Sequence, residues 1–368
     1  MTANLNLGKL FGTQVVVHWT FFILIAWVIL SESFSGKPWS YIVFDRILFN
    51  LEFVIAVMIC VLLHELGHVL AAKRYGIKTE RIVLLPIGGI SAQDKPTDSP
   101  KEEFFITIAG PLVNIIIAVL LYFIIPVREF LSYNLGEYFN ALNDFSIQTF
   151  LFFLFILNIA LVLFNMIPAF PLDGGRLLRA LLDLQMHRVR ATSVTATIGH
   201  IIAVILLLIG LLFNPMLIFM SLFLFIGNYG ENKIVHQLEL LKGHIVKDAM
   251  LEDISVFHPD DTIEDVIKVI LSGYETNFIV IKNQKIVGLL YHKDIIQNSN
   301  NKTFMVKELM TTKFKTLDAN ERLTAAYELM QDEIHPFFPV LEKDKLVGAI
   351  DSGNLHEFLL MESKSHNF

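Results

Sequence analysis

The chain has 368 residues, of which 54% are hydrophobic and only 18% are charged, and its mean hydropathy is positive. This composition excludes an ordinary soluble globular protein and indicates an integral membrane protein with a soluble part attached. The net charge of -7 excludes a basic nucleic-acid-binding surface, and the single cysteine, Cys60, excludes an internal disulfide framework and a cysteine-cluster metal site.

Apolar runs long enough to cross a bilayer, which takes about 20 residues, divide the N-terminal part into membrane spans. The N-terminus has neither a strongly basic region nor a cleavage site, so we expect a retained first span rather than a signal peptide. The last run is interrupted at Asn214-Pro215, a strong turn signal, which favours two short spans over one kinked helix. The runs lie at Val15–Leu30, Leu51–Ala72, Phe104–Val127, Phe150–Ile167 and His200–Ile226.

Basic residues gather in the connections that follow the second and fourth runs, and the other connections hold few. Since cytoplasmic loops carry the excess of Lys and Arg, this asymmetry predicts six spans, with both termini in the cytoplasm and the chain in the cell (inner) membrane. The basic residues are Lys73, Arg74, Lys78, Arg81, Lys95 and Lys101 after the second run, and Arg176, Arg179, Arg188 and Arg190 after the fourth.

From about Lys233 onward the composition becomes charged and mixed, and a repeat with an offset of 60 residues appears. "VKDAM" at Val246–Met250 recurs as "VKELM" at Val306–Met310, and "KIVG" recurs as "KLVG" at the same offset. Each copy contains an amphipathic helix pattern followed by two strand patterns. We therefore predict two tandem copies of one soluble α/β unit.

The second apolar run carries His64, Glu65 and His68 in an H-E-x-x-H arrangement. Residues four apart lie on one helical face, so the two histidines can hold one cation with Glu65 beside them. Neutral imidazoles suit zinc, and the carboxylate can act as a general base on a water. Ionisable groups inside a span cost about 3 kcal/mol each, which argues against the alternative of a packed polar seam between helices.

A catalytic zinc needs a third protein ligand, and the candidate is Asp173 in "NMIPAFPLDGGRLLRA". Asn165 closes the fourth run there, and Gly174-Gly175 permit close backbone approach. Taken alone, Asp173 is also a typical N-cap for the helix that follows. The H-E-x-x-H motif at the same end of the membrane favours the ligand, which predicts one zinc ion per chain.

Together these residues resemble the site-2 protease family of intramembrane metalloproteases, in particular its CBS-containing bacterial and archaeal type, similar to the sporulation protease that processes a sigma-factor precursor. The resemblance implies that His64, His68 and Asp173 bind zinc, that Glu65 activates water, and that transmembrane proteins are hydrolysed within the lipid bilayer. The matching motifs are "VHWTFF" (Val17–Phe22), "HELGH" (His64–His68), "LLPIGGIS" (Leu84–Ser91), "AGPLVN" (Ala109–Asn114) and "NMIPAFPLDGG" (Asn165–Gly175).

Substrate handling leaves several alternatives. A helical substrate hides its carbonyls, so the strand-prone segment around Gly88 and Gly89 could form a hairpin that pairs with an extended substrate; the alternative is a plain connecting loop. The resemblance suggests that Asn165 holds the substrate backbone or a developing oxyanion. The alternative is that Asn165 only ends the helix. "AGPLVN" favours helix bending and close packing over catalysis. His18 is read as an interfacial histidine rather than a conditional zinc ligand.

The repeat resembles a CBS-domain pair over about Ile245–Phe358, and the family implies adenine nucleotide binding and association into homodimers. The family pattern for the ribose contact is a Ser or Thr three positions before an Asp. In the first repeat Asp294 keeps the acid but Tyr291 replaces the hydroxyl residue, and in the second repeat Asp351 and Asn354 replace both. The alternative is a dimerisation or substrate-docking module. The predicted domains are residues 1–232 (six-span metalloprotease), 233–244 (linker), 245–304 (first CBS domain) and 305–368 (second CBS domain).

Two rival functions belong to other classes. A transporter or channel with a CBS gate is one, but it has no need of Glu65 beside two metal ligands. A catalytically inactive relative is the other, and the intact Glu65 argues against it. The predicted architecture is a polytopic α-helical membrane domain followed by a soluble α/β CBS pair, and the predicted function is intramembrane zinc endopeptidase activity regulated by that pair.

Overall fold

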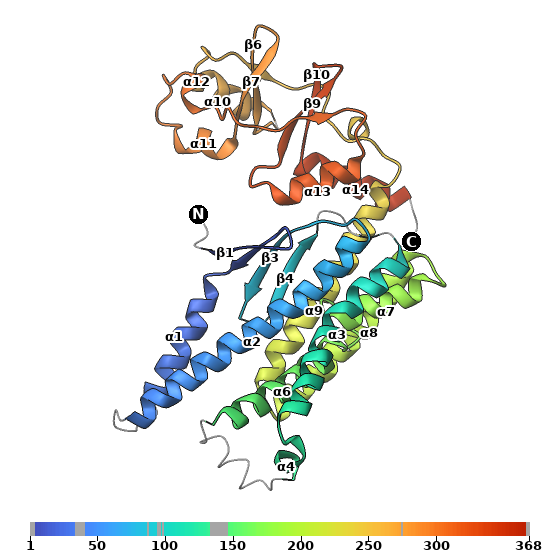
Figure 1. The fold of residues 1–368 in the computed structure, drawn as a ribbon. Coiled ribbons are helices and arrows are strands. Elements are labelled where there is room, and N and C mark those ends of the chain that lie inside the picture. Colours follow the sequence, from blue (N-terminus) through green and yellow to red (C-terminus); the bar gives the residue numbers. More distant parts are fainter. Residues whose placement is uncertain are drawn as a thin grey trace. The chain divides into compact units, whose positions relative to one another are not determined.

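The computed structural model describes residues 4–33, 41–86, 88–93, 97, 99–132, 146–273 and 275–365. The chain divides into two compact units, Met1–Lys233 and Ile234–Phe368. Helices dominate the first unit, which also carries one small sheet, whereas the second unit combines two small sheets with short helices (Figure 1).

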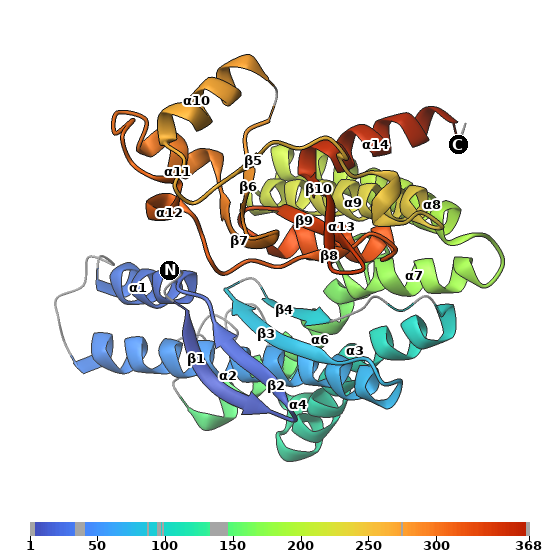
Figure 2. The ribbon, with the colours of Figure 1, turned by 90° about the horizontal axis from the view of Figure 1, so that it is seen from above.

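The sheet of the first unit has the order β1-β2-β3-β4 and packs on the long helix α2 (Figure 2). Both outer pairs are antiparallel, and the two central strands are parallel. Alternate valines of β2 are buried against Leu66 and Val69 of α2, as expected for a strand with one face on a core. The elements are β1 (Leu5–Leu10), β2 (Thr13–Val17), β3 (Thr79–Leu85), β4 (Gly88–Gln93) and α2 (Tyr41–Arg74).

This sheet corrects one prediction and confirms another. The run Val15–Leu30 is not a single helix, because its first residues belong to β2 and the helix, α1 (Thr20–Ser33), begins later. Consecutive valines favour strand, and an apolar run alone does not distinguish strand from helix. The hairpin expected around Gly88 and Gly89 is present as β3–β4, and its pairing with a substrate stays a prediction.

Among the described residues, four helices are long and apolar enough to cross a membrane. The predicted break at Asn214-Pro215 is confirmed, since α8 ends at Leu212 and α9 (Met216–Leu241) starts after it. The count of six spans stays a prediction. The four helices are Phe44–Arg74 within α2, α3 (Pro100–Ile124), α6 (Ile147–Asn165) and α8 (Arg188–Leu212), and two short helices, α4 (Val127–Leu131) and α7 (Asp173–Asp183), lie between them.

Helices α2 and α3 approach each other closely because each has a glycine at the contact. A Cβ built on Gly67 would lie 2.7 Å from the carbonyl oxygen of Ala109, and one built on Gly110 would collide with the His68 imidazole. Small residues at such a contact bring helix backbones together. The predicted close approach of "AGPLVN" to the metal-motif helix is confirmed.

The second unit contains the same fold twice. In each repeat a parallel strand pair is followed by an antiparallel hairpin, and both hairpins turn through two residues with positive φ, Asn283-Gln284 and Lys343-Asp344. The elements are β5 (Val256–Phe257), α10 (Ile263–Ser272), β6 (Phe278–Lys282), β7 (Lys285–Leu290), α11 (His292–Gln297), α12 (Val306–Leu309), β8 (Leu317–Asp318), α13 (Leu323–Asp332), β9 (Phe337–Glu342), β10 (Lys345–Asp351) and α14 (Ser352–Ser365), with a 3-10 turn at Val246–Asp248.

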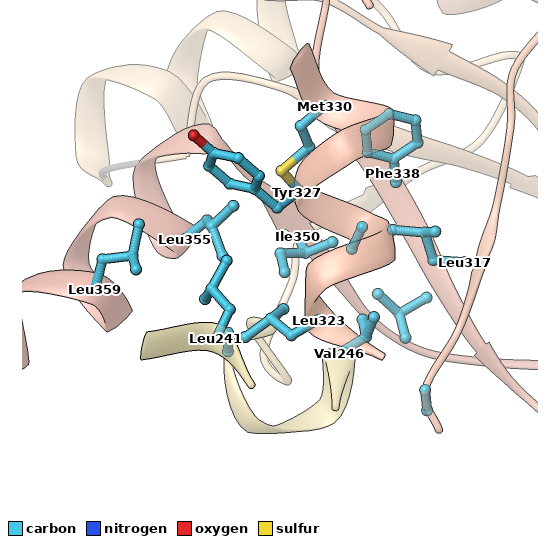
Figure 3. Packing of buried hydrophobic residues seen from close by; sticks show 14 residues of the cluster. Leu241, Val246, Leu317, Leu323, Tyr327, Met330, Phe338, Ile350, Leu355 and Leu359 are labelled. Carbon is cyan, nitrogen blue, oxygen red and sulfur yellow. The ribbon is translucent and has the colours of Figure 1, made fainter. Parts of the chain in front are cut away.

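Each repeat completes the core of the other. Val246 begins the first repeat, yet it packs in the core of the second beside Leu323 (Figure 3). Val306 begins the second repeat, yet it packs in the core of the first with Phe278. Leu241, at the end of α9, is also fully buried in the second core. Two isolated β-bridges also join the repeats, Leu251↔Ala349 and Leu289↔Thr311. Their residues correspond to each other at the 60-residue offset of the repeat.

Candidate metal and catalytic site

Helices α2 and α7 bring together three side chains of the types that ligate metals. His64 and His68 lie one turn apart on α2, are 7% and 3% exposed, and have their Nε2 atoms 3.2 Å apart. Asp173 is the first residue of α7, and its Oδ2 lies 3.1 Å from Nε2 of His64 and 3.3 Å from Nε2 of His68. Within the described part of the chain these residues form a group able to hold a metal ion.

Helix α3 fixes the orientation of both imidazoles. His64 Nδ1 donates to Oδ1 of Asn114 at 3.0 Å, and His68 Nδ1 donates to the carbonyl oxygen of Ile106 at 2.8 Å. With the hydrogen on Nδ1, each neutral ring presents a lone pair at Nε2. Asp173 Oδ2 is an acceptor too. Three acceptors that face one another without a hydrogen between them repel, and a cation removes that repulsion.

The spacing of the three atoms fits zinc. Zinc binds histidine nitrogen and carboxylate oxygen at about 2.0–2.2 Å with tetrahedral geometry, which places neighbouring donor atoms about 3.3–3.6 Å apart. The observed separations of 3.1, 3.2 and 3.3 Å lie close to that edge length. Donor types, burial and distances therefore all fit a zinc ion bound by His64, His68 and Asp173.

The loop before Asp173 packs closely against Gly174 and Gly175, the two glycines that follow Asp173. A Cβ on Gly174 would collide with the carbonyl groups of Met166 and Ile167, and a Cβ on Gly175 would lie 2.6 Å from the carbonyl carbon of Ala169. The loop formed by residues 166–172 can therefore fold directly against the start of α7. Leu172 occupies the N-cap position, and the Asp173 side chain contacts both histidines, so the N-cap alternative for Asp173 is wrong.

A cavity of about 340 Å³ contains this group. Glu65 is 8% exposed, and its side chain lies against Gly89 of the sheet. A Cβ built on Gly89 would be only 2.9 Å from the Glu65 Cδ and Oε1. The predicted residues that line the cavity are His64, Glu65, His68, Gly88, Gly89, Asn165 and Asp173.

Three other cavity residues were not assigned to the site from the sequence: Arg176 and Phe223 were not considered for it, and Asn114, within "AGPLVN", was assigned to packing. The remaining lining residues are Val61, Leu161, Phe164, Pro171 and Leu172. Arg176 follows Asp173 by three positions on α7, and that helical spacing is a signal that could have found it. Asn114 could have been suspected because a polar residue in an apolar helix needs a partner. Phe223 lies on α9, and no sequence signal points to it.

Comparison with known proteins identifies the family. Residues 52–209 match peptidase family M50, and residues 246–301 and 306–360 each match the CBS domain. A zinc metalloprotease of Methanocaldococcus jannaschii is 38% identical over 292 residues, covering 79% of this chain and 78% of that protein. The chain belongs to the M50 peptidase family.

The comparisons with this M50 peptidase also include a solved structure and a sporulation protein. The solved Site-2 protease from Methanocaldococcus jannaschii is 36% identical and covers 62% of this chain and 95% of its own, with a TM-score of 0.44. Stage IV sporulation protein FB of Bacillus subtilis is 30% identical over 138 residues, which cover 37% of this chain and 42% of that protein. The predicted family, the zinc metalloprotease class and the tandem CBS pair are confirmed, and the transporter alternative is set aside.

Other sequence candidates lie elsewhere in the M50 peptidase. His18 Nδ1 is 2.8 Å from Thr20 Oγ1, and His18 does not belong to the metal group found in the described residues. In the CBS unit a cavity of about 160 Å³ includes Tyr291 and His335, whose rings stack with centroids 4.7 Å apart. Asp294 is half-buried on α11 and is not among the described residues that line this cavity.

Proposed function

We propose that this M50 peptidase is an intramembrane zinc endopeptidase that hydrolyses peptide bonds in or near transmembrane segments. The observation that carries the proposal is the buried triangle of His64 Nε2, His68 Nε2 and Asp173 Oδ2, with sides of 3.1–3.3 Å and with Glu65 in the same cavity. Zinc held there would supply Lewis acidity toward the scissile carbonyl and toward a water.

The protein side chains would manage the proton and the substrate. Glu65 takes a proton from the attacking water and later delivers it to the leaving amine. Asn114 and the Ile106 carbonyl keep both imidazoles with the hydrogen on Nδ1. Asn165 lines the same cavity, and its amide is suited to hold substrate backbone or the developing oxyanion.

Strand β4 supports a specific mode of substrate binding. It is one of the two edge strands of the sheet, and its residues Gly88 and Gly89 line the cavity next to Glu65. An extended substrate segment can add to such an edge through backbone hydrogen bonds, which would expose a carbonyl that a helix would hide. The absence of a side chain on Gly89 leaves room for the Glu65 carboxyl group at this point.

We further infer that the CBS pair regulates the peptidase from the cytoplasm. The basic residues after the second and fourth apolar runs support this topology. Helix α9 belongs to both units, since Phe223 lines the catalytic cavity and Leu241 is buried in the CBS core. A bound adenine nucleotide is the proposed effector, with Asp294 as the ribose contact that the family pattern suggests.

The test compares purified wild type with Glu65→Gln, Asp173→Ala and the control Glu52→Gln, which changes an exposed carboxylate on the same helix. Bound zinc and cleavage of a membrane-anchored substrate are measured in detergent. Wild type and Glu52→Gln should hold about one zinc and cut, Glu65→Gln should hold zinc without cutting, and Asp173→Ala should lose zinc. Normal zinc binding by Asp173→Ala, or cleavage by Glu65→Gln, would refute the assignment.

A further inference from the structure

Asn228, on α9, is fully buried and bonds to the loop that precedes Asp173. Its Oδ1 accepts a hydrogen bond from the backbone N–H of Phe170 at 2.9 Å, and its Nδ2 donates to the carbonyl oxygen of Leu224 at 2.7 Å. Phe170 lies three positions before Asp173 and is 1% exposed. The side-chain amide of Asn228 therefore hydrogen-bonds through both of its polar atoms, through Nδ2 to its own helix and through Oδ1 to the loop.

This bond is the long-range anchor of the loop backbone. The N–H groups of Met166 and Ile167 bond back to α6, and those of Ala169 and Leu172 bond within the loop. The two prolines of residues 166–172 have no N–H to offer. The structure describes every residue of this loop. Among its N–H groups, only that of Phe170 hydrogen-bonds to an element distant in the sequence, and its acceptor is Asn228.

The surrounding helices leave space for this arrangement. A Cβ on Gly199 of α8 would collide with the Asn228 amide, and a Cβ on Gly227 of α9 would collide with Pro171. A side chain at either glycine would displace the amide or the loop. Two glycines on two helices therefore permit α8, α9 and the loop to meet at Asn228.

A second contact holds the Phe170 ring. The guanidinium carbon of Arg179, on α7, lies 5.0 Å from the ring centroid, and Arg179 is bonded to Glu103 of α3 and Glu231 of α9. Burial raises the pKa of Glu231, but the Arg179 charge outweighs this effect and leaves the pKa below its usual value. Backbone and ring of Phe170 are thus both linked to α9.

We propose that Asn228 is a positioning residue for the metal ligand Asp173: it fixes the 166–172 loop so that the Asp173 carboxylate meets the two histidines. The inference rests on the proposed zinc site. It also extends the functional machinery beyond residues 52–209, which match the peptidase family, onto the helix that leads to the CBS pair. A buried N–H without a partner is costly, so the loop is expected to shift when Asn228 is lost.

The experiment titrates metal-free, full-length protein in detergent with Co²⁺, whose visible absorption reports coordination geometry, and then with Zn²⁺ in competition. Asn228→Leu has the same number of side-chain heavy atoms but no acceptor. Asn228→Asp, when protonated, can accept from Phe170 and donate to Leu224. The matched control is Ser221→Ala, because Ser221 is also buried on α9 and its Oγ donates to the Ala203 carbonyl of α8 at 2.7 Å, away from the loop.

We expect Asn228→Leu to weaken metal binding about 10-fold and to change the Co²⁺ spectrum, as partners behind a ligand typically do. Asn228→Asp and Ser221→Ala should resemble wild type. Asn228→Ala is measured in parallel, because it removes the acceptor without adding bulk against Gly199. Wild-type affinity and spectrum in folded Asn228→Leu or Asn228→Ala would overturn the proposal, and so would an equal loss in Ser221→Ala.

Asp173→Ala separates this proposal from the one on which it rests. If Asp173→Ala binds Co²⁺ and Zn²⁺ as wild type does, the zinc site itself is wrong, whatever Asn228 does. If Asp173→Ala loses metal while the Asn228 variants keep it, the zinc site stands and only the role of Asn228 fails.

Discussion

Replacing Asn114 with leucine should weaken zinc binding while the fold is kept. Asn114 is fully buried, and its Oδ1 accepts from His64 Nδ1 at 3.0 Å. A buried donor left without its partner costs about 1–3 kcal/mol, which corresponds to about 5- to 150-fold in a dissociation constant. Loss of the acceptor behind a ligating histidine typically costs about 10- to 100-fold in metal affinity. The two ranges overlap, so we expect a loss of about 10- to 100-fold.

The assay is competition for zinc between purified protein and a chromogenic chelator, with circular dichroism to verify the fold. The matched control is Asn158→Leu, since Asn158 is also fully buried but bonds to the Leu154 carbonyl and to Cys60 rather than to a metal ligand. Unchanged affinity in Asn114→Leu would refute the reasoning. An equal loss in Asn158→Leu would show that the effect comes from general helix packing.

Three other outcomes are expected. Removing zinc with a chelator should abolish cleavage, and zinc but not magnesium should restore it, because magnesium prefers all-oxygen ligands; recovery with magnesium would contradict the ligand set. Gly89→Ala should lower the cleavage rate with zinc content unchanged, since its Cβ would crowd the Glu65 carboxyl group; a wild-type rate would argue against this contact. Arg179→Met should lower the free energy of unfolding by less than the about 3–5 kcal/mol typical of a broken buried pair, because Glu103, 1% exposed, loses Arg179 but keeps its ion pair with Arg188; adding Glu103→Gln should recover part of the loss.

The metal group was predictable because local geometry determines most of it. Residues four apart on a helix share a face, so His64 and His68 had to be neighbours once α2 was expected. Asp173 was found by asking for a third ligand near the same end of the membrane. The contact between Asn114 and His64 was not predictable, because it depends on how α3 is rotated against α2, and many side chains jointly determine that rotation.

The strand at Val15–Val17 shows a second limit of sequence reasoning. An apolar run directly before a helix fits a longer span equally well, and only pairing with β3, more than 60 residues away, decides for a strand. The hairpin around Gly88 and Gly89 was easier to predict, because Pro86 and the two glycines mark its turn region locally.

Val246 of the first CBS repeat is buried in the core of the second, and Val306 of the second is buried in the core of the first, so neither repeat has a complete core without the other. A stop codon after the first repeat would remove Val306 and expose the core that it fills, and loss of the first repeat would remove Val246 from the second. An excised pair would also need the end of α9, because Leu241 is part of its core and Gln237 accepts a hydrogen bond from Tyr327 at 2.9 Å. The repeats can therefore be gained, lost or transplanted in evolution only together, and with them the tail of the helix on which Asn228 lies.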